Sequence, residues 1–263
     1  MIAISDTLRT KKVVPSGTIV INRPERRNAL SREAVAALIE AFEDFHQERS
    51  VRAVILTGAG DSFCSGSDLQ QIHESSADVN ALEIWHDDAR QLQQLIELML
   101  RFPKPIIAAV NGWVVGSGVA LMLAADIVIA GTSSKLLMPE AQRGLSSGLT
   151  APLLAFRIGA GNAANVLFRG LAFDANHALR LGLYHEVVDD ELVWARSHEI
   201  VKQMATGASE SHQLAKQILN ETIGESLLTQ LSIGAANMAA ARTTLAAREG
   251  IAAFLEKRPP NWQ

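Results

Sequence analysis

An α/β fold is the class that the sequence predicts, and three observations predict it. Short β-branched or apolar runs alternate with segments of helical periodicity up to about residue 190, and the connections between them are short. A strand–turn–helix pattern recurs about three times along this part of the chain. With 263 residues, of which 48% are hydrophobic and 20% charged, the chain is long and apolar enough to bury a large core.

Local signals place the elements in chain order. Ser31 is a typical helix N-cap, and the helix that follows it has apolar side chains at helical spacing. Pro103 and Pro105 end a long helical segment, because proline cannot continue a helix. The expected elements are strands over residues 17–21, 51–57, 106–110 and 127–129, and helices over 32–47, 70–76, 82–101 and, as a series, from about 190 to 256.

Two turns rich in glycine and serine follow buried strands. Residues 64–69 (CSGSDL) come after the apolar run at 53–56, and residues 111–118 (NGWVVGSG) come after the run at 106–110. At such a strand-to-helix turn the first N–H groups of the helix have no intrahelical partner, and small residues leave them exposed. Two of these groups converging on one point can hold a thioester oxygen as it becomes negative. The turns therefore predict acyl-group chemistry through an enolate-like intermediate.

Composition and charge argue against several other classes of protein. The formal net charge is −4 and no long basic run is present, which argues against a nucleic-acid partner. Cys64 is the only cysteine, so an intramolecular disulfide is excluded and a cytoplasmic location is expected. Residues 1–10 lack the pattern of a signal peptide, and the apolar stretch at 114–130 is too short and interrupted to span a bilayer. No membrane partner is therefore expected.

Seven motifs stand in register along nearly the whole chain. They are residues 21–24 (INRP) with 28–30 (NAL), 63–69 (FCSGSDL), 104–112 (KPIIAAVNG), 125–130 (ADIVIA), 139–140 (PE), 249–250 (EG) and 253–258 (AFLEKR). In this order they resemble the crotonase superfamily, the enoyl-CoA hydratase/isomerase family. The resemblance implies a crotonase-like spiral of β-β-α units over residues 1–195 and a C-terminal helical trimerisation region over residues 196–263 that completes the CoA site.

The resemblance also implies the ligand, the assembly and the site. The substrate would be an acyl-CoA, with coenzyme A as part of the substrate and no separate cofactor or metal, and the chain would form a homotrimer or a dimer of trimers. The N–H groups of Ser67 and Ser117 match the oxyanion-hole positions, and Glu140 matches a catalytic carboxylate. Further matched positions would contact CoA or the acyl group: Arg26, Arg27, Ala29, Ser65, Gly66, Asp68, Leu69, Gly116, Phe254 and Lys257. Asp68 is equally well explained as a helix cap.

The catalytic carboxylates depart from the hydratase pattern. The resemblance implies that hydratases of this family use two catalytic glutamates. Ala120 stands at the position of the first glutamate in this sequence, and the second is retained as Glu140. One carboxylate suffices to move a proton from C2 to C4 of a 3-enoyl thioester, provided that an apolar environment raises its pKa toward neutrality. The favoured activity is therefore isomerisation of 3-enoyl-CoA to 2-enoyl-CoA. The structural alternative is that Glu140 caps a helix N-terminus.

Two other functions remain open. A hydratase or an acyl-CoA hydrolase could use another pocket residue, with His73 and His86 as candidates, although each is more typical of a solvated surface. A non-catalytic paralogue that binds acyl-CoA or RNA is also compatible with Ala120, but the negative net charge disfavours RNA. Arg143 could pair with Glu140 on one helical face, and we expect instead that it points away into solvent or a subunit contact.

Overall fold

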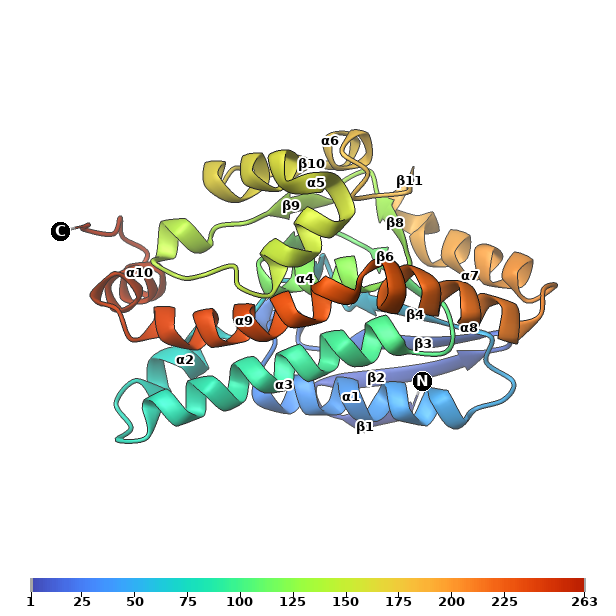
Figure 1. Cartoon of the computed structure of the whole chain (residues 1–263), viewed down its shortest axis with the longest axis horizontal. Coiled ribbons are helices and arrows are strands. Elements are labelled where there is room, and N and C mark those ends of the chain that lie inside the picture. The colour runs from blue at the N-terminus through green and yellow to red at the C-terminus, as the bar shows by residue number, and fades with distance from the viewer. Residues whose placement is uncertain (1, 263) are drawn as a thin grey trace.

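The computed structural model describes residues 2–262, which form two sheets covered by helices (Figure 1). The strands are β1 (Ile2–Ser5), β2 (Leu8–Val13), β3 (Ser16–Ile21), β4 (Ala53–Gly58), β5 (Ser62–Cys64), β6 (Ile106–Val110), β7 (Trp113–Val115), β8 (Ile127–Gly131), β9 (Lys135–Leu137), β10 (Phe173–Asp174) and β11 (Glu186–Val188). The α-helices are α1 (Arg32–Gln47), α2 (Leu69–Ser75), α3 (Ala81–Arg101), α4 (Ser117–Ala124), α5 (Thr150–Arg169), α6 (Ala175–Arg180), α7 (Val193–Met204), α8 (Ser209–Gln217), α9 (Glu225–Arg242) and α10 (Leu245–Leu255). Short 3₁₀ turns are η1 (Pro24–Arg26), η2 (Glu140–Arg143) and η3 (Asp190–Leu192), and η4 (Ile218–Ile223) is a π-helix.

The two sheets are built from repeated β-β-α units. The larger sheet has the order β1-β2-β3-β4-β6-β8-β11 and the smaller one the order β10-β9-β7-β5. The pairs β4–β5, β6–β7 and β8–β9 each send their first strand into the larger sheet and their second into the smaller one. All pairings from β3 to β11 in the larger sheet are parallel, as are those between β5, β7 and β9. The expected spiral of β-β-α units is confirmed.

Strand register brings the two predicted turns together. Val54 of β4 lies opposite Ile106 of β6, and Cys64 of β5 lies opposite Val114 of β7. The chain therefore leaves β5 and β7 at the same edge of the smaller sheet, where α2 and α4 begin. Gly118 at the start of α4 packs directly on the Cys64 carbonyl, which leaves no room for a side chain there.

Two asparagines of the sequence motifs hold the approach to these turns. The Asn28 side chain donates to the carbonyl oxygens of Ala59 and Ser62, at 2.8 and 2.6 Å. The Asn111 side chain donates to those of Gly58 and Gly60, at 2.8 and 2.9 Å. Each amide gives two backbone carbonyl groups a hydrogen-bond donor, and these contacts fix the loops before the turns.

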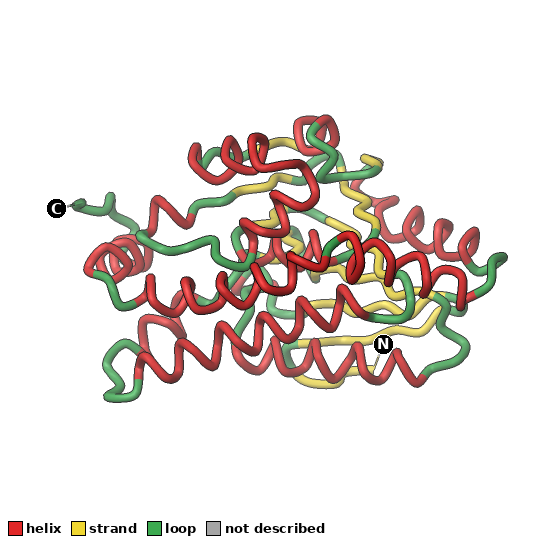
Figure 2. Tube along the Cα trace, in the orientation of Figure 1, coloured by secondary structure: helices red, strands yellow, loops and turns green. Residues whose placement is uncertain are grey.

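Helices cover the sheets, and the C-terminal ones return over the core. In Figures 1 and 2, α9 lies alongside α3, and the two helices are in contact along their lengths. The apolar side of α9, with Leu227 and Leu231 buried, closes one face of the main core. The expected boundary after residue 195 falls inside α7, and residues 1 and 263, which end the two expected regions, lie outside the described residues. No helix in the described part of the chain is long and apolar enough to cross a membrane.

Candidate active site

A pocket opens where the two turns meet. Ser65, Gly66, Ser67 and Leu69 line it from the first turn, and Gly116 and Ser117 line it from the second. The backbone of Gly66 has φ +86°, and a Cβ on this residue would come within 3.1 Å of the Ser117 nitrogen. Glycine is therefore required at this position both for its positive φ and for the close approach of the two loops.

Ser67 and Ser117, whose backbone N–H groups are the expected oxyanion donors, both line this pocket. Leu30 binds the first turn through two backbone hydrogen bonds, donating to Gly66 at 2.8 Å and accepting from Asp68 at 3.0 Å. Because N–H groups alternate in direction along extended backbone, the N–H of Ser67 points away from Leu30. Ser117 is the first residue of α4, so its N–H has no intrahelical acceptor. The two hydroxyl groups are hydrogen-bonded to each other at 3.0 Å.

Glu140 brings a carboxylate to the second turn. It begins η2, with two residues between it and the end of β9, and its Oε1 lies 2.6 Å from the point where a Cβ on Gly116 would stand. Its Oε2 is buried and has no hydrogen-bond partner within the described residues. Burial raises the pKa of Glu140 to about 7, and its own backbone N–H, the Arg143 charge and the Ser147 hydroxyl each lower it by less. A carboxylate with this pKa can accept and return a proton near neutral pH.

Arg143 also lines this pocket, so the expectation that its side chain points away from Glu140 is wrong, whereas a contact with another subunit stays a prediction. Its side chain is partly buried, and the guanidinium carbon lies 3.9 Å from the centre of the Phe254 ring. Stacking on an aromatic face holds the guanidinium in place. Arg143 thus sits in the same pocket as Glu140, and its positive charge favours the ionised carboxylate.

Asp68 has a structural role that the sequence left open. Its Oδ1 accepts from the N–H groups of Gln70 and Gln71 at the start of α2, at 3.1 and 3.4 Å. Its Oδ2 forms an ion pair with Arg23 at 3.0 Å, and both side chains are largely buried. Arg23 in turn donates to the carbonyl of Ala29 at 2.6 Å. These contacts account for the Asp68 side chain, which lines a neighbouring pocket and not the one with Glu140.

The structure does not bring the other expected CoA contacts into this pocket. Arg26 and Arg27 are exposed on the loop before α1, and the carbonyl groups of both accept hydrogen bonds from Ser65, at 3.2 and 3.0 Å. Ala29 is buried beside them. Phe254 is half-exposed near the end of α10, and Lys257 follows it on the surface. Neither His73 nor His86, both exposed, lines either of the two pockets that share Ser67.

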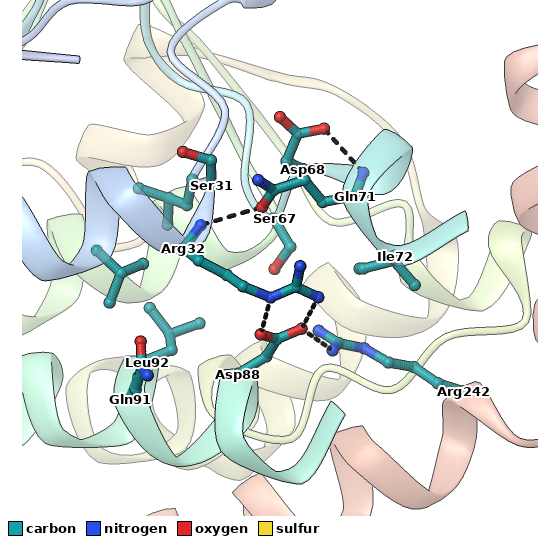
Figure 3. A pocket seen from close by; sticks show the side chains of 12 residues that line it. Ser31, Arg32, Ser67, Asp68, Gln71, Ile72, Asp88, Gln91, Leu92 and Arg242 are labelled. Atoms are coloured by element: carbon teal, nitrogen blue, oxygen red, sulfur yellow. Dashed lines mark hydrogen bonds and ion pairs between the residues drawn. The ribbon is translucent and has the colours of Figure 1, made fainter. Parts of the chain in front are cut away.

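Sequence reasoning missed the contribution of α9. Met238 and Arg242 of this helix line the pocket with Glu140, and Arg242 also lines a second pocket between α1, α2 and α3 (Figure 3). Ser67, Ile72 and Arg242 line both pockets, which therefore adjoin each other beside the first turn. Arg242 follows an alanine-rich stretch with no local motif, so only the tertiary structure reveals its place. We call the second space the polar pocket, after the charged groups of Arg32, Asp88 and Arg242 that line it.

The fold and the paired turns are those of enzymes that act on CoA thioesters, and comparison with known proteins agrees. The family model described as enoyl-CoA hydratase/isomerase matches residues 16–263. The chain is 32% identical to the 1,2-epoxyphenylacetyl-CoA isomerase of Escherichia coli over 246 residues, covering 93% of this chain and 94% of that one. It is 30% identical to the crotonyl-CoA hydratase of Syntrophomonas wolfei over 250 residues, covering 93% of each.

Solved structures give the same result. The crystal structure of an enoyl-CoA hydratase from Bacillus halodurans superposes with a TM-score of 0.87 at 26% identity, covering 94% of this chain and 99% of that one. The chain belongs to the enoyl-CoA hydratase/isomerase family, the crotonase superfamily that its motifs resemble. It is an enzyme of that family and takes an acyl-CoA substrate.

Proposed function

We propose that the protein is an isomerase that converts 3-enoyl-CoA into 2-enoyl-CoA with Glu140 as its single acid–base group. The observation that carries this proposal is which titratable groups line the pocket at the two turns, residues 64–69 and 111–118. Glu140 is the one carboxylate lining that pocket among the described residues, and Ala120, at the position of the missing second glutamate, is fully buried in α4. A methyl group cannot activate water, whereas one carboxylate can shuttle a proton.

The proposed isomerisation requires only groups of this chain and the substrate. Ionised Glu140 removes a proton from C2, and the electron pair delocalises onto the thioester oxygen, which accepts hydrogen bonds from the N–H groups of Ser67 and Ser117. Such donors are strongest where water is excluded. Protonated Glu140 then returns the proton at C4, and the double bond moves to C2–C3. No redox step or added group takes part, so we propose that the enzyme uses no cofactor beyond the CoA of its substrate.

Hydration is the second candidate, because several relatives have hydratase names, the crotonyl-CoA hydratase of S. wolfei among them. Two assays distinguish these activities. Purified enzyme is given 3-hexenoyl-CoA in one reaction and 2-hexenoyl-CoA in another, and chromatography follows the products. We expect isomerisation of the first and little hydration of the second. Hydration of 2-hexenoyl-CoA at a rate similar to that of an established hydratase assayed alongside would contradict the proposal.

We further propose a homotrimer or a dimer of trimers in the cytoplasm. The C-terminal helices leave large apolar side chains in solvent, with Ile233, Leu245 and Phe254 exposed by 59%, 80% and 47%. A subunit interface would remove this apolar surface from water. Light scattering coupled to size-exclusion chromatography gives the mass directly, and a monomer at micromolar concentration would refute the assembly. A single buried cysteine is consistent with a reducing compartment.

A further inference from the structure

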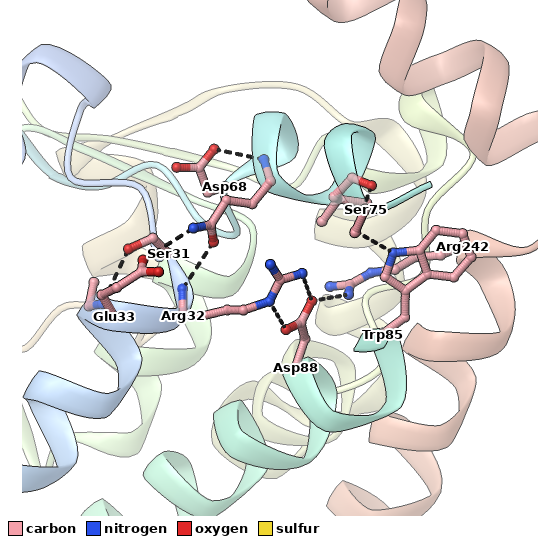
Figure 4. Close-up of polar contacts among 11 residues, drawn as sticks. Ser31, Arg32, Glu33, Asp68, Ser75, Trp85, Asp88 and Arg242 are labelled. Atoms are coloured by element: carbon pink, nitrogen blue, oxygen red, sulfur yellow. Dashed lines mark hydrogen bonds and ion pairs between the residues drawn. The ribbon is translucent and has the colours of Figure 1, made fainter. Parts of the chain in front are cut away.

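The polar pocket contains a charged cluster that joins three helices. Asp88 of α3 accepts from Nε and Nη2 of Arg32 on α1, at 2.6 and 3.1 Å, and pairs with Nη1 of Arg242 on α9 at 3.4 Å (Figure 4). One carboxylate therefore faces two guanidinium groups. The cluster as a whole carries an excess positive charge.

Two neighbouring acids make their hydrogen bonds and ion pairs outside the cluster, and Glu33 acts on Arg32 only through its charge. Asp68, which also lines the pocket, is paired with Arg23 at 3.0 Å. Glu33 is exposed on α1, where it accepts a hydrogen bond from Gln71 at 3.1 Å. Burying a charge without full compensation is costly.

Arg242 is the residue whose donors are least satisfied. Its side chain is only 5% exposed, and the long contact to Asp88 is the one hydrogen bond that it makes within residues 2–262. Its Nε and Nη2 are thus without a partner in that part of the chain. Burial lowers the pKa of Arg242 to about 10 despite the neighbouring carboxylate. Arg32 likewise uses Nε and Nη2 on Asp88 and has Nη1 unoccupied among the described residues.

The cluster adjoins the pocket at the two glycine- and serine-rich turns. Ser67 and Arg242 border both the polar pocket and the pocket with Glu140, and Figure 3 shows Ser67 above the Arg32–Asp88 pair. An acyl chain whose thioester oxygen is held at Ser67 can extend from there toward Arg242. An apolar chain end would make no hydrogen bond to these free donors, whereas a carboxylate would accept from them and cancel the excess charge.

We propose that the polar pocket binds a carboxylate at the far end of the acyl chain, so that the substrates are CoA monothioesters of short dicarboxylic acids. This inference rests on the proposed function only in that the thioester oxygen lies at Ser67 and Ser117. Because Ser67 borders both pockets, the chain between thioester and carboxylate is short. Arg242 is then a specificity-determining residue, and Arg32 and Asp88 position it.

The test compares two saturated thioesters of six carbons that differ only at the chain end, adipyl-CoA and hexanoyl-CoA. Isothermal titration calorimetry with the whole protein measures binding and requires no reaction, so it stands whether or not the enzyme isomerises. We expect wild-type protein to bind adipyl-CoA at least tenfold more tightly. Equal affinities, or tighter binding of hexanoyl-CoA, would overturn the inference while leaving the isomerase proposal intact. Failure to bind either compound would contradict both.

Variants assign the preference to the cluster. Arg242→Met has an apolar side chain of similar length and leaves Asp88 paired with Arg32, so the fold has no unpaired carboxylate. We expect it to lose the preference for adipyl-CoA without weaker binding of hexanoyl-CoA, and Arg242→Lys to retain part of it. Arg90→Met, at an exposed arginine of α3, is the matched control and should behave as wild type. A preference unchanged in Arg242→Met would refute the assignment.

Discussion

The replacement of Glu140 by glutamine should make the protein more stable at alkaline pH than the wild type. The folded-state pKa of Glu140 is about 7, against 4.5 for an ordinary glutamate, because burial penalises the charged form. The folded protein therefore holds this proton more tightly than the unfolded chain. The stabilisation that comes from binding this proton is fully present below pH 4.5 and is lost as the pH rises through 7. This rise in the pKa of Glu140 corresponds to about 3 kcal/mol in the free energy of unfolding. The value is an upper bound, because Glu140 keeps some solvent contact.

Glutamine has the shape of glutamate but does not ionise, so the difference between the two proteins isolates this one group. We expect equal melting temperatures near pH 4.5 and an advantage of a few degrees for Glu140→Gln at pH 8.5, since about 1 kcal/mol moves the midpoint of a domain of this size by roughly 2–4 °C. Differential scanning calorimetry of both proteins across this range measures it. A difference in melting temperature that does not change with pH would refute the claim that burial raises the pKa of Glu140.

Three further predictions concern the same loops. The kcat/KM of the wild type should rise with pH through about 7 as the Glu140 carboxylate ionises. Arg143→Met should move the midpoint of this rise to higher pH, because the arginine charge favours the ionised carboxylate. A flat pH–rate profile, or a midpoint that moves to lower pH, would contradict this prediction. Gly116→Ala should lower kcat at least tenfold, since its Cβ would meet the Glu140 carboxylate at 2.6 Å and its φ is +55°. Gly161→Ala, in open space, is the control. Asp68→Asn keeps a helix cap but loses the ion pair with Arg23, so it should lower the melting temperature by less than Asp68→Ala, and equal losses would mean that the cap contributes nothing.

Local chemistry explains what the sequence could predict. Glycine and serine at a strand end, with no room for larger side chains, mark the turns at Ser67 and Ser117, and these signals are visible without a structure. The helix at 32–47 begins at Ser31, whose hydroxyl accepts from Ala34 at 3.2 Å as a cap does. The β-β-α repeat followed from resemblance, because strands of three residues such as β5 and β7 are too short to show periodicity.

Tertiary contacts explain what it could not predict. Arg143 was expected away from the site, but its guanidinium stacks on Phe254 of α10, and that contact joins residues far apart in the chain. Arg242 has no motif around it, and only the packing of α9 along α3 places it beside Asp88. The placement of Ser67, Ser117 and Glu140 around one pocket agrees with the roles that the resemblance implies, and those roles stay predictions until they are tested.

The most direct test of a single-carboxylate isomerase is the turnover of 3-hexenoyl-CoA by Glu140→Gln. Acid–base catalysis by one side chain contributes about 10²–10⁴-fold to the rate. We therefore predict a fall in kcat of that size, with hexanoyl-CoA still bound within a few-fold of wild-type affinity. A kcat within a few-fold of wild type would show that another group moves the proton and would contradict the account.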